Sequence, residues 1–238
     1  MSIKAVLFDL DGTLLPLDQD LFIKLYFKEI TEYLVKNGGY DPEAFMKAMW
    51  QGIGAMINND GSQTNEEAFW AVFSKLFGEE RVKKDYPVFE RFYIERFSNT
   101  KTASKNTVWS KRIVDFLKKR EKAVVLATNP VFPSIATNNR MGWVGLAPND
   151  FDLVTTYENI GYCKPNPHYY TEIAKRIGVL PSECLMVGND VSDDMIAATV
   201  GMDVFLLTDC LINSKNEDIS KYPNGDFEQL FQYIKAKI

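Results

Sequence analysis

The chain has 238 residues, of which 25% are charged and 46% hydrophobic, proportions that are ordinary for a globular protein. Its 27 basic and 32 acidic side chains leave a formal net charge of -5 without a dense basic block, so we expect no nucleic acid and no acidic membrane surface as a partner. The three cysteines are widely spaced and form no Cys-x-x-Cys pair, which predicts neither a disulfide framework nor a zinc site and favours reduced thiols in the cytoplasm.

The first predicted strand covers residues 3–8, an apolar run that leads into Asp9-Leu10-Asp11-Gly12-Thr13. Side chains of an extended segment alternate between faces, so Asp9 and Asp11 leave the strand end on the same side. Asp11-Gly12 alone is an ordinary turn signal, but the carboxyl end of a strand is also where open α/β sheets bind ligands. Two carboxyl groups this close together raise each other's pKa and are not readily ionised at the same time. The pair therefore predicts a metal ion, a shared proton, or both.

The next segment, from about residue 18 to residue 97, has helical spacing of its apolar residues and few strand-like runs. Glycine-containing breaks divide it into predicted helices near residues 19–36, 42–57, 65–77 and 81–97. Because the segment follows the paired acids directly, we expect an inserted all-helical cap over residues 17–98 that lies above the mouth of the site.

From about residue 107 onward, short apolar runs alternate with helical patterns. The predicted strands lie near residues 123–127, 152–155, 184–187 and 204–207, and the predicted helices near 107–120, 132–140, 167–177 and 193–200. A last amphipathic stretch near residues 227–234 is expected to dock on the core as a helix. This alternation predicts an α/β fold, a Rossmann-like doubly wound parallel sheet, built from residues 1–16 and 99–238.

Polar residues follow three more of the apolar runs, as the two acids follow the first. Thr128 and Asn129 come between a strand and a helix, where a hydroxyl and backbone amides can hold a phosphate, although both residue types are also ordinary helix caps. Lys164 precedes a stiff proline-bounded loop. Asp190 lies just past a strand and Asp194 falls in the first turn of the next helix, so both can face one cleft.

The charges of this set suggest what it binds. Asp9, Asp11, Asp190 and Asp194 bring four negative charges, and three remain if Asp11 is protonated. One Mg²⁺ together with Lys164 then cancels them, and a phosphate dianion can enter the pocket. Without the metal the same pocket would repel phosphate.

Four segments resemble, in their order along the chain, the four motifs of the haloacid dehalogenase-like (HAD) hydrolase superfamily. They are Asp9-x-Asp11-Gly12-Thr13, Thr128, Lys164-Pro165 and Asp190-x-x-x-Asp194. The resemblance covers residues 3–15 and about 107–210, and the predicted insertion is placed like the helical cap of members that carry it between the first two motifs. It implies a Mg²⁺-dependent phosphatase that hydrolyses a phosphomonoester, a small phosphorylated metabolite, through an aspartyl-phosphate intermediate.

The resemblance also implies roles for individual residues. Asp9 would be the nucleophile and Asp11 the general acid and base. The metal ligands would come from Asp9, Asp11 (by its backbone carbonyl), Asp190 and Asp194. The phosphate-binding residues would be Thr128, Asn129 and Lys164. Members that cleave carbon–halogen bonds lack the second Asp, so the presence of Asp11 favours phosphoryl transfer.

In the cap, we expect the polar, glycine-containing break to contact substrate, although an ordinary solvated loop is the simpler explanation. Its residues are Gln51, Gly52, Asn58, Asn59 and Asp60. The motifs leave a phosphomutase as an alternative, because the cap decides whether water reaches the aspartyl-phosphate. A signalling receiver domain also places acids, Thr and Lys on a doubly wound sheet, but it orders them differently and carries no large helical insertion.

Overall fold

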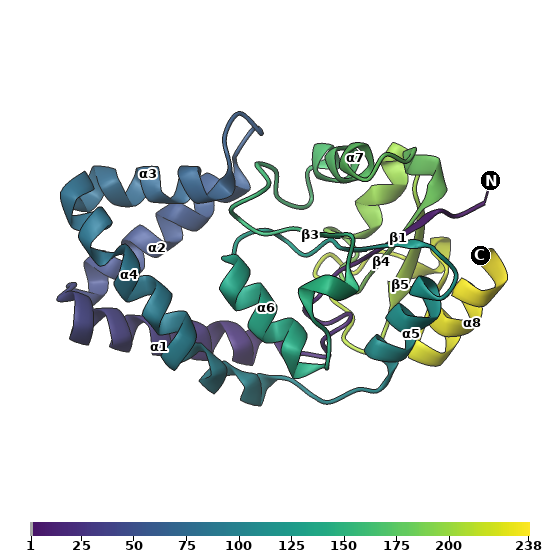
Figure 1. The fold of residues 1–238 in the computed structure, drawn as a ribbon, viewed down its shortest axis with the longest axis horizontal. Coiled ribbons are helices and arrows are strands. Elements are labelled where there is room, and N and C mark those ends of the chain that lie inside the picture. The colour runs from purple at the N-terminus through teal and green to yellow at the C-terminus, as the bar shows by residue number, and fades with distance from the viewer. Residues whose placement is uncertain (1) are drawn as a thin grey trace.

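The computed structural model, which describes residues 2–238, contains one sheet with the strand order β3-β2-β1-β4-β5-β6 (Figure 1). The strands are β1 (Ala5–Phe8), β2 (Ala123–Leu126), β3 (Leu153–Val154), β4 (Cys184–Gly188), β5 (Asp203–Leu207) and β6 (Asn224–Gly225). All neighbours run parallel, and β1 lies between β2 and β4. The strand order reverses at β1, which is the point where open α/β sheets place their ligands.

Helices cover both faces of the sheet because successive strand side chains are apolar on both sides. Val6 and Phe8 belong to the core that includes residues of α5 (Trp109–Lys118), α6 (Ser134–Trp143) and α8 (Phe227–Lys237). On the opposite face, Ala5 and Leu7 pack with residues of α7 (Pro167–Arg176) and of the short 3-10 helix η4 (Met195–Val200). The predicted doubly wound parallel sheet is confirmed.

Directly after β1 the chain forms four helices that stand to one side of the sheet (Figure 1). They are α1 (Gln19–Gly38), α2 (Pro42–Ile57), α3 (Asn65–Phe77) and α4 (Glu79–Glu95). Asp18, Asp41 and Thr64 start the first three helices by accepting hydrogen bonds from backbone amides of the first turn. The helices predicted over 42–57 and 65–77 have these bounds, and the other two differ by two residues.

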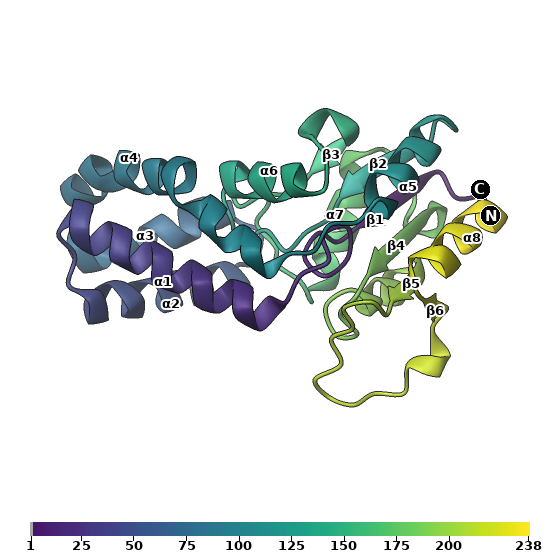
Figure 2. The same cartoon turned by 90° about the horizontal axis from the view of Figure 1, so that it is seen from below.

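The chain enters and leaves this helical segment through two adjacent connections. Leu17 and Ser104 form an antiparallel bridge, and the amide of Asp18 donates to the carbonyl of Ala103 at 2.9 Å. The 3-10 helix η1 (Phe97–Ala103) packs against α1 just before this crossing, and α4 lies beside α6 of the core (Figure 2). The division into a cap at 17–98 and a core at 1–16 and 99–238 stays a prediction.

The four helices α1 to α4 are called the cap below, and the sheet with its covering helices is called the core. A second attachment between cap and core lies at the start of α3. The buried Asn65 donates through Nδ2 to the carbonyl of Pro130 at 3.0 Å and to Cys163 Sγ at 3.2 Å, and its amide donates to the carbonyl of Ile160 at 2.9 Å. Asn59 Nδ2 in turn donates to Asn65 Oδ1 at 2.9 Å. These bonds tie the cap to the loops that follow β2 and β3.

Three further 3-10 helices are η2 (Pro148–Asp150), η3 (Pro181–Glu183) and η5 (Ile219–Lys221). The sequence did not predict β6, because a strand of two residues leaves no periodic pattern.

None of the helices within residues 2–238 combines the length and the apolar composition needed to cross a bilayer.

Aromatic packing inside the cap gives a test of its core. Phe92 of α4 is fully buried and contacts the rings of Tyr26 and Tyr33, whereas Ile94 of the same helix is 67% exposed. We expect Phe92→Ala to lower the free energy of unfolding by about 3–5 kcal/mol, because it removes transfer energy and leaves a cavity. Ile94→Ala should change it by less than about 0.5 kcal/mol. Urea unfolding measures both, and equal effects would contradict this packing.

Candidate functional site

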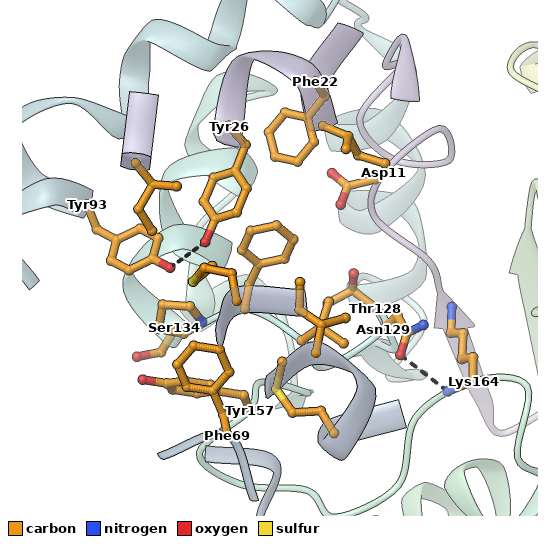
Figure 3. A pocket seen from close by; sticks show the side chains of 18 of the residues that line it. Asp11, Phe22, Tyr26, Phe69, Tyr93, Thr128, Asn129, Ser134, Tyr157 and Lys164 are labelled. Atoms are coloured by element: carbon orange, nitrogen blue, oxygen red, sulfur yellow. Dashed lines mark hydrogen bonds between the residues drawn. The ribbon is translucent and has the colours of Figure 1, made fainter. Parts of the chain in front are cut away.

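The carboxyl edge of the sheet gathers the polar residues that the sequence singled out. Asp9 and Asp11 follow β1, Thr128 and Asn129 follow β2, Lys164 lies in the loop between β3 and α7, and Asp190 and Asp194 follow β4. All seven line one pocket between the sheet and the cap. Figure 3 shows four of them, Asp11, Thr128, Asn129 and Lys164. The structure therefore brings these residues together, while their roles stay predictions.

Lys164 is at the centre of the site. Its ammonium group, on a residue that is only 3% exposed, donates to Asp9 Oδ1 at 2.8 Å and to Asp194 Oδ1 at 2.7 Å. Burial alone would lower the pKa of Lys164, but the carboxylates of Asp194 and Asp9 raise it well above its ordinary value. The lysine is therefore a fixed positive charge between the loops after β1 and β4.

Asp9 is also buried, and burial raises its pKa to about 7, against the opposing effect of Lys164 and with a further increase from Asp194. Only one of its oxygens takes part in the pair with Lys164. The other, Oδ2, accepts no hydrogen bond from the part of the chain that the structure describes. Asp9 can thus present this oxygen to a ligand in the pocket.

Two glycines allow the loops to approach each other this closely. Gly12 has φ of +82°, and a Cβ there would lie 2.2 Å from Asn189 Nδ2. The next residue, Thr13, donates through Oγ1 to Asn189 Oδ1 at 2.9 Å. A Cβ on Gly188 would lie 2.1 Å from Asp194 Cγ, so a side chain at this position would displace the carboxylate that Lys164 binds.

Backbone hydrogen bonds hold the loop after β2 in place. The carbonyl of Thr128 accepts hydrogen bonds from Thr155 Oγ1 at 2.7 Å and from the Tyr169 hydroxyl at 2.8 Å. Asn129 Oδ1 accepts one from the Lys164 amide at 3.3 Å. This fixes Thr128 beside the lysine in the pocket wall.

Arg140 of α6 is a part of the site that sequence reasoning missed. It is 1% exposed, forms a close ion pair through Nη1 with Asp11 Oδ2, and places its guanidinium 4.4 Å from the centre of the Phe132 ring. Burial raises the pKa of Asp11, and the charge of Arg140 beside it opposes that rise. Asp11 Oδ1 is buried and has no hydrogen-bond partner in the described residues.

The fit of the site to a divalent cation can be tested on these contacts. Within residues 2–238 no three acidic, His or Cys side chains are grouped as a metal site. Lys164 occupies the space between Asp9 and Asp194, and Asp190 Oδ1 accepts hydrogen bonds from the amides of Ser192 and Asp193.

The donor chemistry and the charge nevertheless suit such an ion. The available groups around the pocket are carboxylate and carbonyl oxygens of Asp9, Asp11 and Asp190, the kind of ligand that Mg²⁺ prefers. With Lys164 and Arg140 both charged, the acids exceed the cations by two charges if Asp11 is ionised and by one if Asp11 is protonated, so a divalent ion covers the excess in either state. The charge count made from the sequence, which took Asp11 as protonated, lacked the charge of Arg140.

The structure does not place the expected cap contacts in the pocket. Gln51 is exposed, and a Cβ on Gly52 would lie 2.5 Å from the Phe69 ring, so this glycine serves the close packing of α2 on α3. Asn58 is exposed and donates to the carbonyl of Gly54, which ends α2. In the structure this polar break ends α2 and docks the cap on the core, and its contact with substrate stays a prediction.

Aromatic and aliphatic side chains form the pocket wall instead. They come from all four cap helices and from the loop after β2, and they include Phe22, Tyr26, Ile53, Phe69, Phe89 and Phe132. Figure 3 shows Phe22, Tyr26 and Phe69 among them. From the sequence, each of these looked like an ordinary core residue of an amphipathic helix.

A parallel sheet with this strand order, a helical insertion after β1, and acids around a buried lysine define a class of hydrolases. A model of the haloacid dehalogenase-like hydrolase family matches residues 3–201, and the chain belongs to this family. The expected family membership and the expectation of a hydrolytic enzyme are confirmed.

The curated relatives and the solved structures agree with this assignment. The chain is 26% identical over 225 residues to a glyceraldehyde 3-phosphate phosphatase of Methanothermobacter thermautotrophicus, covering 92% of each chain. It is 24% identical to pyrophosphatase PpaX of Bacillus velezensis, covering 84% of this chain and 80% of that one.

Among solved structures, a HAD phosphatase from Thermococcus onnurineus has a TM-score of 0.60 and 20% identity, and covers 99% of this chain and 100% of its own. A 2-haloacid dehalogenase from Pseudomonas syringae pv. Tomato DC3000 has a TM-score of 0.65 and 19% identity, and covers 98% of this chain and 99% of its own. At these identities the likeness shows the fold that the proteins share.

The pair between Arg140 and Asp11 can be tested by a double-mutant cycle. We expect Arg140→Met to lower the free energy of unfolding by about 3 kcal/mol, because it leaves the Asp11 carboxylate buried without its partner. Combining it with Asp11→Asn should cost at least about 1 kcal/mol less than the two single changes together. Urea unfolding measures the cycle, and strict additivity would contradict the pair.

A matched control is Lys83→Met in α4. Lys83 pairs with Glu80 one turn away, and both side chains are exposed, at 70% and 94%. This change should alter stability by less than about 0.5 kcal/mol.

Proposed function

We propose that this hydrolase is a Mg²⁺-dependent phosphatase of a small phosphomonoester and that it works through an aspartyl-phosphate on Asp9. The observation that carries the proposal is the position of Asp9 at the polar end of the pocket, where Lys164 holds one of its oxygens at 2.8 Å and Asp11 lies alongside. The names of the two curated relatives, both phosphatases, support it.

In the first step, Asp9 Oδ2 attacks phosphorus and the bond from phosphorus to the alcohol oxygen breaks. Asp11 gives a proton to the leaving alcohol oxygen, for which the unpartnered Oδ1 is the available atom. In the second step, Asp11 takes a proton from water as the water attacks phosphorus. The bond between phosphorus and Asp9 then breaks, which releases phosphate and restores both carboxyl groups.

The remaining residues hold the phosphoryl group during these steps. Lys164, Thr128 and Asn129 would donate to its oxygens, which their shared position in the pocket lining supports, and Lys164 would also offset the charge of Asp9. Arg140 orients Asp11 by holding its other oxygen. Because all of these groups are fixed before the ligand binds, little reorganisation is needed as charge develops.

The Mg²⁺ ion would be held by oxygens of Asp9 and Asp190 and by the backbone carbonyl of Asp11, with Asp194 ligating directly or through water. When bound, it would neutralise charge on the phosphoryl oxygens. Asp194 is the least available of these groups, because it already accepts hydrogen bonds from Lys164 and from the Asp190 amide.

The nucleophile assignment predicts the effect of a single substitution. Asp9→Asn should lower the rate of phosphate release from a phosphomonoester by at least about a thousandfold, because an amide oxygen is a poor nucleophile. The rate is measured as inorganic phosphate released over many turnovers, and circular dichroism shows whether the fold is kept. A rate near that of the wild type would refute the assignment.

The matched control is Asp203→Asn. Asp203 begins β5 at the opposite edge of the sheet and pairs with Lys237 on the surface. This variant should keep the wild-type rate.

The same assay on the wild-type enzyme also tests the phosphomutase alternative. Transfer of phosphate within the substrate, without release, would indicate that alternative.

Metal dependence is tested by chelation. Treatment with EDTA should abolish phosphate release, because excess negative charge in the pocket would then repel the phosphate dianion. Addition of Mg²⁺ should restore the rate and raise the melting temperature, since an ion that binds the folded state stabilises it. A full rate in EDTA would contradict the metal.

A further inference from the structure

The pocket that holds Asp9 continues as an apolar cavity into the cap. Its volume is about 340 Å³, and its walls beyond the site are formed by side chains of α1, α2, α3 and α4 and of the loop after β2. From these walls we infer that the alcohol released from the phosphomonoester is apolar and carries a straight alkyl, branched alkyl or aryl-alkyl group. It is not a sugar of any size, including a triose. This inference rests on the proposed phosphatase function and names its substrate class.

The composition of the walls carries the argument. Ile53 and Met56 of α2 face the cavity together with Phe22 of α1, Phe69 of α3 and Phe132 of the core, and rings such as Phe22 and Phe132 lie 6.0 Å apart. Such surfaces gain free energy by excluding water around an apolar ligand, and aromatic rings offer faces on which it can pack.

Several polar groups in the same walls already have partners. The hydroxyls of Tyr26 and Tyr93 are hydrogen-bonded to each other at 3.0 Å, and the Tyr86 hydroxyl donates to Glu66 at 3.0 Å. A sugar phosphate brings a hydroxyl on nearly every carbon. Each hydroxyl that entered this cavity without a partner would weaken binding by about fivefold or more.

Two buried polar atoms in the walls lack a hydrogen-bond partner in the described residues, namely Trp70 Nε1, which is a donor, and Glu158 Oε2, which is an acceptor. Gln19, Glu90 and Ser134 add polar side chains to the lining. These few groups allow an occasional polar atom on an otherwise apolar alcohol, which is far fewer than a sugar carries.

The volume sets the size of the ligand. At about 30 Å³ for each water-sized group, the cavity has room for on the order of ten non-hydrogen atoms. A phosphate group at the polar end leaves space for an apolar chain of about six carbons, so n-hexyl phosphate is a suitable probe.

The first test is a chain-length series at equal leaving-group chemistry. Ethyl, butyl and hexyl phosphate release alcohols of nearly the same acidity, so differences in kcat/KM report on binding of the chain. We expect kcat/KM to rise by about fourfold for each added methylene, as expected for full burial of the group. Glycerol phosphate and glyceraldehyde 3-phosphate should be poorer substrates than hexyl phosphate.

Equal kcat/KM for ethyl and hexyl phosphate, or a preference for either polar ester, would overturn the inference while leaving the phosphatase intact. If no ester releases phosphate, the proposed function fails, and a binding measurement still decides the inference. Hexylphosphonate, which cannot be hydrolysed at its P–C bond, should bind at least tenfold more tightly than ethylphosphonate by calorimetry. Equal affinities would overturn it.

The second test compares two isoleucines of α2. Ile53 lines the cavity, whereas Ile57, one turn later, is 49% exposed and outside it. Ile53→Trp should fill the space and lower the ratio of kcat/KM for hexyl to ethyl phosphate at least tenfold, and Ile57→Trp should leave the ratio unchanged. If Ile53→Trp does not fold, Ile53→Thr should lower the ratio by making the wall polar. An unchanged ratio in a folded Ile53 variant would overturn the inference.

Discussion

The site depends on one buried cation, the ammonium group of Lys164 between the carboxylates of Asp9 and Asp194. A buried lysine without a counter-charge would lose its proton or unfold the region, and two buried carboxylates without a cation would repel each other. Each group is therefore tolerable only because the others are present. The loops after β1, β3 and β4 are held at one point by this requirement, which the close approach at Gly188 makes possible.

Apolar side chains around the site strengthen a second ion pair, the one between Asp11 and Arg140. Rings such as Phe22 and Phe132 keep the surroundings of Asp11 and Arg140 poor in water, and ion pairs are stronger where the dielectric constant is low. Any group with unsatisfied charge or hydrogen-bonding capacity is correspondingly costly there. A single pocket can thus combine a highly charged end, suited to phosphate, with walls that disfavour polar ligands.

The sequence predicted most of the sheet, because Val6, Phe8 and their neighbours lie in apolar runs long enough to be recognised, and it located polar residues that share one edge. It did not predict Arg140, since a basic residue at the end of an amphipathic helix is indistinguishable from a solvated one until the helix is docked. Gln51 and Asn58, where it predicted substrate contacts, lie outside the pocket lining for a related reason. Polar residues in a break signal a turn, whereas only the packed structure shows whether that turn meets the ligand or the core.

The buried Asn65 joins two mechanical parts of the molecule. Its side chain bonds the residues that directly follow Asn129 and directly precede Lys164, namely Pro130 and Cys163. The same buried amide thus gives α3 and the two loops that carry Asn129 and Lys164 a shared anchor. A substitution at this one position would remove the anchor from both loops, although the side chain itself touches neither functional residue.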